Sequence, residues 1–448
     1  MLRRLPLSLT ATASALVISL TALTAASLPA GAQDAGLRVD ADATGVSFGS
    51  AVTLDALSSD DAYRQLLIDN VNMVSTVDEF DVAVVQPQPG VFDFSRLDAI
   101  VDFAEEHDMT VRGHGLIGAG GLPDWITGGS WTAETLAEVL REHVTAVVGR
   151  YADRNPGVVT QWDVVDEAFL PDGTPRPTIW QQVIGPDHFQ IAFGAARAAD
   201  PDALLFYDDF YDDLAVTSDA IAAGIDIVPG ATAERSTCDE IPKCVAVRST
   251  MSSLVAADVP IDGIGVQAHL LSPDPVDFQA FSAWIDELGL TWAITEFDVP
   301  VPSTEIANPD TLAFQAATYA AALAACVDAA GCDTFVTWGI TDRLPPTADT
   351  TGGAFGGGLW FDATDAPKPA FDAMAEVLGR AAPPPPTTDA PEVVESAPAT
   401  TSPVATEPGD DDQGSVITAI AVGAAALVIV GFVIALARRR RPRPSAER

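Results

Sequence analysis

The chain has 448 residues and a formal net charge of −40 at pH 7, from 63 acidic and 23 basic side chains. A surface of this charge repels nucleic acids and anionic lipids, so both are poor partner candidates for the bulk of the chain. With 48% hydrophobic residues, the chain has enough apolar material for one large globular domain and for flanking segments of other kinds.

Residues 1–32 have the pattern of a secretory signal peptide. Arg3 and Arg4 give a basic start, the apolar stretch ALVISLTALTAA follows, and the small residues Ala30–Gly31–Ala32 are typical of a cleavage site. The alternative is an anchor that stays in the membrane. The interrupted apolar run and the small-residue ending favour cleavage after Ala32, and hence export.

The next region, residues 35–380, alternates short β-rich runs with helical patterns. Eight of the runs predict strands, because they are short, apolar and rich in β-branched and aromatic residues. They cover residues 45–52, 72–76, 110–117, 160–168, 203–209, 263–270, 291–299 and 335–341.

Between these runs, apolar residues recur at helical spacing, most clearly in residues 95–108, 132–152, 186–200 and 309–329. Eight strands that alternate with helices predict an α/β fold of the (β/α)8 TIM barrel type. A doubly wound open sheet is the alternative. No glycine-rich phosphate loop follows the first predicted strand, which weakens that alternative.

Four cysteines form two pairs with C-x5-C spacing, Cys238 with Cys244 and Cys326 with Cys332. In an exported protein, an even number of closely spaced cysteines predicts two local disulfides. A four-cysteine zinc site is the competing interpretation. Its usual C-x2-C to C-x4-C spacing differs from the spacing here.

Three further segments follow the predicted barrel. Residues 381–414 are rich in Pro, Thr and acidic residues and predict an extended linker. Residues 416–437 are uncharged and long enough to span a bilayer as one helix. Residues 438–448 begin with RRRRPR, and such a basic cluster marks the cytoplasmic side. The pattern predicts a single-pass cell-membrane protein with its predicted barrel domain outside the cell.

Polar side chains lie where the predicted strands end, which is where TIM barrels carry their active sites. Two glutamates among them fit glycoside hydrolysis, in which one carboxyl group protonates the leaving oxygen and the other attacks the anomeric carbon or activates water. A tryptophan face suits the C–H face of a sugar ring. The strand-end residues are His114, Asp166, Glu167, Gln267, His269, Glu296, Asp298 and Trp338.

Two other classes of function are weighed against this prediction. A metal-dependent hydrolase is disfavoured because His107, His114 and His269 lack H-x-x-x-H spacing, so we expect neither a metal nor another cofactor. A surface glycan-binding protein on the same barrel is the stronger alternative. A pure binder has no need of an acid and a nucleophile at a set spacing, so the paired glutamates favour an enzyme.

Six motifs occur in a fixed order: GHGLIG with LPDW, WDVVDEA, GIGVQAHL, ITEFDV, TWGITD and PKPAFDAM. Together they resemble glycoside hydrolase family 10, the endo-1,4-β-xylanase family, over residues 40–378. The resemblance implies a (β/α)8 barrel that hydrolyses β-1,4-xylan inside the chain with retention of anomeric configuration. A xylan-like polysaccharide is then the expected partner.

The resemblance also implies roles for individual residues. Glu167 matches the general acid/base, and Glu296 matches the nucleophile. His269 matches the histidine that contacts the nucleophile, and Asp298 matches the aspartate that supports this pair. Three more residues match the lining of the −1 subsite, and Cys326–Cys332 matches a family disulfide. The three lining residues are His114, Gln267 and Trp338.

Several positions depart from the family pattern. Asp166 replaces the asparagine before the acid/base. We expect its charge to raise the pKa of Glu167, and the alternative is that Asp166 is protonated and imitates asparagine. The −2 subsite also loses its usual side chains, so we expect it to be wide and acidic. The positions concerned are Val77, Asp78, Asp81, Gly118 and Gly121.

Overall fold

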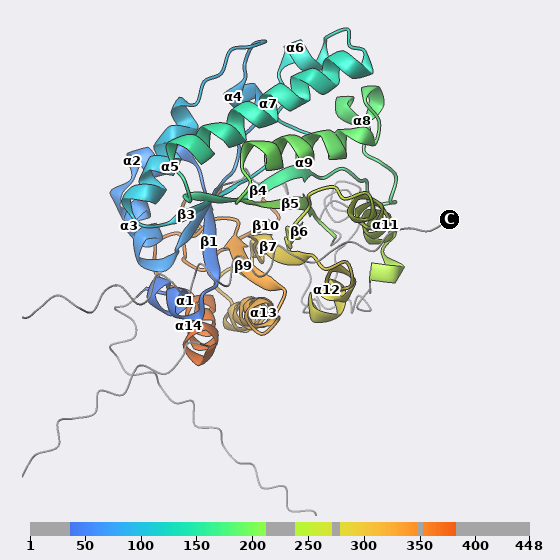
Figure 1. The fold of residues 1–448 in the computed structure, drawn as a ribbon. Coiled ribbons are helices and arrows are strands. Elements are labelled where there is room, and N and C mark those ends of the chain that lie inside the picture. Colours follow the sequence, from blue (N-terminus) through green and yellow to red (C-terminus); the bar gives the residue numbers. More distant parts are fainter. Residues whose placement is uncertain (1–35, 212–237, 271–277, 347–352, 382–448) are drawn as a thin grey trace, which may run out of the picture. The chain divides into compact units, whose positions relative to one another are not determined.

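The computed structural model describes residues 36–211, 238–270, 278–346 and 353–381. The predicted signal peptide, linker, membrane span and basic tail lie outside these residues. The described part forms a closed barrel of eight parallel strands with helices around it (Figure 1). The predicted (β/α)8 barrel is therefore confirmed, and the doubly wound alternative is wrong, because the first strand pairs with the last.

All eight predicted strands are present in the barrel, in chain order. Each begins and ends within a few residues of the predicted bounds. The barrel strands are β1 (Ser47–Val52), β2 (Met73–Thr76), β3 (Thr110–Gly113), β4 (Val159–Asp166), β5 (Leu204–Asp209), β6 (Gly263–Val266), β7 (Thr291–Phe297) and β9 (Cys332–Thr337). A small antiparallel pair, β8 (Val301–Pro302) with β10 (Phe355–Gly356), lies outside the barrel.

Helices connect the strands and form the outer layer. They are α1 (Arg38–Thr44), α2 (Leu54–Ser59), α3 (Asp61–Asn70), α4 (Val82–Val85), α5 (Ser95–Glu106), α6 (Asp124–Thr127), α7 (Ala133–Arg154), α8 (Ile179–Val183), α9 (Asp187–Ala199), η1 (Cys238–Glu240), α11 (Pro242–Ala256), α12 (Phe278–Glu287), α13 (Pro309–Val327) and α14 (Pro369–Ala381). The four predicted helices correspond to α5, α7, α9 and α13.

Helix α7 illustrates how local sequence fixes an element of this layer. Thr132 and Thr135 form a reciprocal capping box at its N-terminus, which satisfies backbone N–H groups that the helix leaves free. Its buried residues include Leu136, Leu140 and Val144, spaced four apart, so they form one stripe toward the barrel. The exposed face between them carries most of the charge of the helix.

The barrel closes through β1, which pairs with both β2 and β9.

Close packing between neighbouring strands needs small residues at particular points. A Cβ atom at Gly113 would lie 2.3 Å from the ring of Trp162, so the indole packs directly on the backbone of β3. Outside the barrel, α13 contacts α14 and β9.

Charged and polar groups also enter the barrel, which an apolar strand pattern does not predict. Arg112 in β3 is fully buried and donates to both carboxylate oxygens of Asp163 and to Gln161. Gln161 in turn donates to Thr334 in β9 at 2.7 Å. This network crosses the interior from β3 to β9, and it supports the layer of side chains at the mouth.

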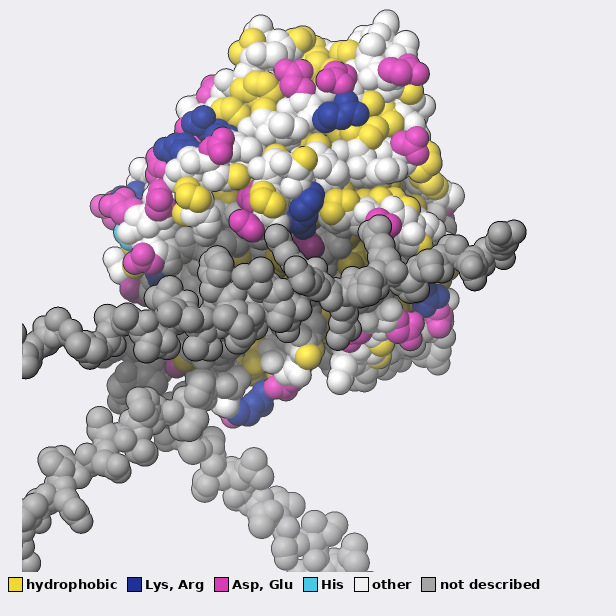
Figure 2. Space-filling model, in the orientation of Figure 1, with side chains coloured by type: hydrophobic (Ala, Val, Ile, Leu, Met, Phe, Trp, Pro, Cys, Tyr) yellow, Lys and Arg dark blue, Asp and Glu magenta, His cyan; other side chains and the backbone are white. Residues whose placement is uncertain are grey.

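Both predicted disulfides are present, and the zinc alternative is wrong because each cysteine is bonded to a sulfur. Cys238–Cys244 joins η1 to α11, and Cys326–Cys332 joins α13 to β9. Acidic side chains are spread over the visible face rather than gathered in one patch (Figure 2). Among the described residues, only α13 is long and apolar enough for a membrane span, and it packs in the outer layer.

Candidate active site

The carboxyl ends of five strands bring the predicted residues to one mouth of the barrel. His114 directly follows β3, Glu167 follows β4, Glu296 lies near the end of β7, and Trp338 follows β9. The next residue after β6 is Gln267. The arrangement follows from parallel strands, whose carboxyl ends all lie at the same edge.

Glu296 is almost fully buried, with 4% of its surface exposed. Its Oε2 lies 2.9 Å from His269 Nε2, and His269 Nδ1 lies 2.9 Å from Asp298 Oδ1. Burial alone would lower the pKa of His269, but Asp298 and Glu296 outweigh it and raise the pKa well above its usual range. The imidazolium therefore bridges two carboxylates and fixes Glu296.

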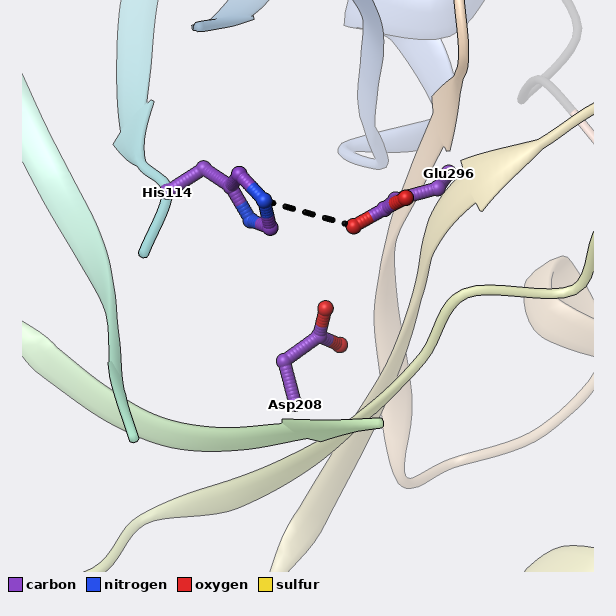
Figure 3. Close-up of side chains that lie close together, drawn as sticks. All are labelled: His114, Asp208 and Glu296. Atoms are coloured by element: carbon purple, nitrogen blue, oxygen red, sulfur yellow. Dashed lines mark ion pairs between the residues drawn. The ribbon is translucent and has the colours of Figure 1, made fainter. Parts of the chain in front are cut away.

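His114 approaches Glu296 from the opposite side. Its Nε2 lies 3.4 Å from Glu296 Oε1 (Figure 3), and its Nδ1 lies 3.2 Å from Asp163 Oδ2. Burial opposes a charge on this ring, yet Glu296 and Asp163 raise the pKa of His114 well above its usual range. Arg112 neutralises Asp163 from below. The two histidines thus surround Glu296 with positive charge.

Trp338 covers both histidines. Its ring meets His114 edge-on at 5.4 Å between centroids and His269 at 6.0 Å. The indole is 6% exposed, so most of its surface is used for packing against the histidines and their surroundings. Trp338 therefore holds the imidazoles in place and forms a wall of the site.

Glu167 lies across the mouth in a different setting. Its backbone is left-handed, with φ of 48°, which is uncommon for a residue with a side chain. Gln267 donates to its Oε1 at 3.3 Å, and Arg176 donates to its Oε2 at 3.2 Å and to its backbone oxygen at 2.7 Å. The Glu167 side chain is 29% exposed, so it exchanges protons with solvent.

Asp166 differs from the main expectation for it. Burial first, and then the neighbouring Glu167, raise the pKa of Asp166 well above its usual range. Its Oδ1 lies 3.3 Å from Gln267 Nε2. Both causes disfavour the ionised form of Asp166, so they favour the alternative prediction, a protonated Asp166 of asparagine shape, over a charged Asp166.

The region aligned with the −2 subsite is acidic but not simply wide. A Cβ atom at Gly121 would lie 2.2 Å from the carboxyl carbon of Asp81, so Asp81 fills the space that a side chain at residue 121 would need. Burial, and after it Asp78, raise the pKa of Asp81 to about 6. At Gly118 the nearest atom to an added Cβ is Asp166 Oδ2, at 3.5 Å. Val77 is half-buried beside Asp78.

Sequence reasoning missed two buried aspartates at the end of β5. Asp208 accepts from Thr295 Oγ1 at 2.8 Å, and burial first, then Asp163 and Glu296, raise its pKa well above its usual range. Asp209 forms an ion pair with Lys243 at the start of α11. The run LLFYDD ends in two acids, as β4 ends in Asp166 with Glu167 directly after it, so the strand-end signal used elsewhere was present here as well.

Comparisons with known proteins identify the family of the chain. The model of glycosyl hydrolase family 10 matches residues 36–227 and 236–377. Endo-1,4-beta-xylanase C of Phanerodontia chrysosporium is 32% identical over 73% of this chain and 75% of its own length. Native xylanase 10B of Thermotoga maritima is 30% identical, with a TM-score of 0.64 over 77% of this chain and 98% of that one. XylE of Penicillium canescens, an endo-1,4-beta-xylanase, gives 27% identity and a TM-score of 0.65 over 77% and 97%.

Proposed function

Because the chain belongs to glycosyl hydrolase family 10 and is a xylanase-like glycoside hydrolase, we propose that it cleaves β-1,4-xylan or a related β-glycan inside the polysaccharide. Curated relatives carry the name endo-1,4-beta-xylanase, and the similar xylanase 10B of Thermotoga petrophila forms a complex with xylobiose. The one observation that carries the proposal is the pair of differently held glutamates at the barrel mouth.

The reaction is a double displacement in which Glu296 is the nucleophile. Its carboxylate attacks the anomeric carbon, the glycosidic bond breaks, and Glu167 gives its proton to the leaving oxygen. Water then attacks the glycosyl-enzyme while Glu167 takes up a proton, so the product keeps the original configuration. Burial and two histidines suit Glu296 to its role, since they fix one orientation of the carboxylate and exclude water.

The remaining strand-end residues support this pair. His269 and Asp298 orient Glu296 through the two 2.9 Å contacts. Gln267 contacts both Glu167 and Asp166, so it sets the position of the acid relative to the −1 sugar. His114 contacts Glu296, and Trp338 packs against both histidines. The reaction needs no metal ion or organic cofactor, since the two carboxyl groups supply both proton and nucleophile.

The site is proposed to act at the outer face of a cell membrane. This part of the proposal is supported by the sequence alone: the signal-like residues 1–32, the Pro- and Thr-rich residues 381–414, the apolar residues 416–437 and the basic residues 438–448. At about 3.1 Å per residue, an extended linker of this length reaches roughly 100 Å. Such reach suits an enzyme that acts on polysaccharide beyond a cell wall.

The experiment uses the purified full chain in detergent, assayed on xylan, other β-glycans and aryl β-glycosides. Products are separated by size, and the anomer formed first is identified by NMR. Internal cleavage of a β-1,4-glycan with initial release of the β-anomer supports the proposal. Binding to these polysaccharides without hydrolysis, even of activated aryl glycosides, would instead identify a surface glycan-binding protein.

A further inference from the structure

Asp208 has no part in the double displacement, yet its carboxyl group lies at the catalytic centre. The side chains of His114, Asp208 and Glu296 come from three strands and point into one small space (Figure 3). One nitrogen of His114 and one carboxylate oxygen from each acid lie within 4.8 Å of one another. Asp208 is fully buried, and Glu296 is 4% exposed.

Each of these side chains is held by its other polar atom. Asp163 holds His114 Nδ1 at 3.2 Å, Thr295 donates to Asp208 Oδ1 at 2.8 Å, and His269 holds Glu296 Oε2 at 2.9 Å. The atoms left over are His114 Nε2, Asp208 Oδ2 and Glu296 Oε1. Outer contacts that fix orientation in this way are typical of metal ligands.

The two leftover oxygens, Asp208 Oδ2 and Glu296 Oε1, are buried and lack hydrogen-bond partners among the residues that the structure describes. Glu296 Oε1 keeps only the 3.4 Å ion-pair contact with His114 Nε2. Burial of a carboxyl oxygen without a hydrogen bond is costly, because the contacts with water are lost and not fully replaced. A cation between them would satisfy both oxygens at once.

The histidine completes the set. When Asp163 accepts a hydrogen bond from Nδ1–H, the imidazole presents a lone pair at Nε2 as soon as the proton there is displaced. A mixture of one nitrogen and two carboxylate oxygens suits Zn²⁺, which takes three protein ligands and leaves a fourth position open. Mg²⁺ and Ca²⁺ prefer six or more oxygens and fit the set poorly.

We propose that His114, Asp208 and Glu296 form a binding site for a zinc-type divalent cation. The ion displaces the proton from His114 Nε2 and any proton on Asp208, and it coordinates Glu296 Oε1. Because that oxygen belongs to the nucleophile, the bound ion blocks attack on the anomeric carbon. This second consequence rests on the proposed function of Glu296, whereas binding itself does not.

The first experiment is calorimetric titration of EDTA-treated, dialysed full chain in detergent with ZnCl2. We expect one tight ion per chain above the weak background that a net charge of −40 attracts. Asp208→Asn keeps the shape and the Thr295 contact but removes a ligand charge, so it should weaken the tight phase tenfold or more. Asp166→Asn is the matched control, since it alters a neighbouring mouth carboxyl outside the set and should leave the tight phase intact.

A second measurement needs no variant. Co²⁺ bound to the wild-type chain should give the intense visible absorption of four-coordinate cobalt, and added Zn²⁺ should remove it. Weak, six-coordinate absorption would overturn the proposal. So would a single weak phase in the titration, or an equal loss of affinity in Asp208→Asn and Asp166→Asn, because either result reports only the general acidity of the surface.

Inhibition is tested separately from binding. Zn²⁺ should slow hydrolysis of an aryl β-xyloside and should protect Glu296 from covalent labelling by an activated 2-fluoro-xyloside, and EDTA should reverse both effects. If the 2-fluoro-xyloside labels another residue in the zinc-free enzyme, or labels no residue at all, the proposed role of Glu296 as nucleophile is contradicted. The zinc site itself is unaffected by that result. Tight zinc binding with unchanged labelling of Glu296 would overturn the inhibitory role of zinc, while the zinc-binding site itself would stand.

Discussion

The two glutamates at the barrel mouth lie in opposite kinds of environment. Glu296 is 4% exposed and is held by histidines on both sides. Glu167 has a side chain that is 29% exposed, a left-handed backbone and contacts with Gln267 and Arg176. A nucleophile gains from a fixed position without water, whereas an acid/base must exchange its proton with solvent in each cycle. The difference in burial therefore supports the proposed roles of Glu296 as nucleophile and Glu167 as acid/base.

The largest loss of activity should come from substitution of the buried glutamate, Glu296. Glu296→Ala removes the nucleophile, so turnover of aryl β-xylosides should fall by about 10⁴-fold or more, and labelling by a 2-fluoro-xyloside should stop. Kinetics and mass spectrometry of the intact chain check both results. Glu142→Ala, an exposed acid on α7 outside the site, serves as the control. Residual turnover above 1 part in about 100 would mean that Glu296 is not the nucleophile.

Substitution of the more exposed glutamate, Glu167, should affect substrates with poor leaving groups more than those with good leaving groups. Glu167→Ala should slow xylan hydrolysis by about 10²- to 10⁴-fold, because general acid catalysis contributes that much. Aryl glycosides with activated leaving groups need little protonation and should lose less in the first step. Azide should restore part of the activity by replacing the water that Glu167 would activate, with formation of a glycosyl azide. Equal losses on both substrate types and no rescue would remove Glu167 from its role.

Asp81, in the region aligned with the −2 subsite, extends the comparison from catalysis to substrate specificity. Asp81, whose pKa burial raises to about 6, is ionised above that pH and neutral below it. Discrimination against glucuronic acid side groups should therefore be present at pH 7 and decline as the pH falls through about 6. An effect of about fivefold corresponds to the energy of a partly exposed charge pair, about 1 kcal/mol. The measurement is product analysis of glucuronoxylan and its neutral counterpart at pH 5 and pH 7.

Asp81→Asn is the variant for that comparison. It should abolish the pH dependence of the preference while leaving hydrolysis of neutral xylan nearly unchanged. Preferential cleavage next to glucuronylated residues in the wild-type enzyme at pH 7 would show that Asp81 does not face the −2 sugar.

The smallest effect should come from Asp166. Burial and the neighbouring Glu167 raise its pKa well above the usual range, so Asp166→Asn should replace one largely uncharged group by another of the same shape. Turnover at acidic pH should change by less than about tenfold, the factor that one net hydrogen bond is worth. The alkaline limb of kcat/KM should stay in place or move upward, because asparagine cannot ionise. A move to lower pH would show that Asp166 is charged and supports the protonated form of Glu167.

Strand ends explain why so much of the fold and site was predictable. Eight short apolar runs with intervening helical spacing are enough for the barrel, and parallel strands bring their terminal residues together whatever the loops do. The convergence of Glu167, Glu296 and His269 at one mouth was therefore predictable from chain order, whereas their individual roles came from the family resemblance. The two C-x5-C pairs were equally informative, because so short a spacing leaves few other partners.

Contacts made inside the barrel were harder to predict. Arg112, Asp163 and Asp208 lie within or at the end of apolar runs, and the sequence does not tell whether their side chains point into the barrel or toward the helices. Arg176 reaches Glu167 from a turn nine residues later, which no periodicity encodes. The raised pKa of Asp166 also depends on burial, which is a property of the assembled barrel mouth and not of the residues next to Asp166 in the sequence.

Closure of the barrel has a consequence for how the protein is made. Strand β1 pairs with β9, so Ser47 and Thr334 lie side by side although 287 positions separate them in the chain. During synthesis, β1 therefore waits with one open edge until almost the whole domain has emerged, and long-range pairings of this kind form slowly. A ribosome that stops before β9 releases a chain with two exposed strand edges, which invites pairing with other chains. The barrel therefore cannot close until β9 is present, and the chain is most prone to aggregation before that point.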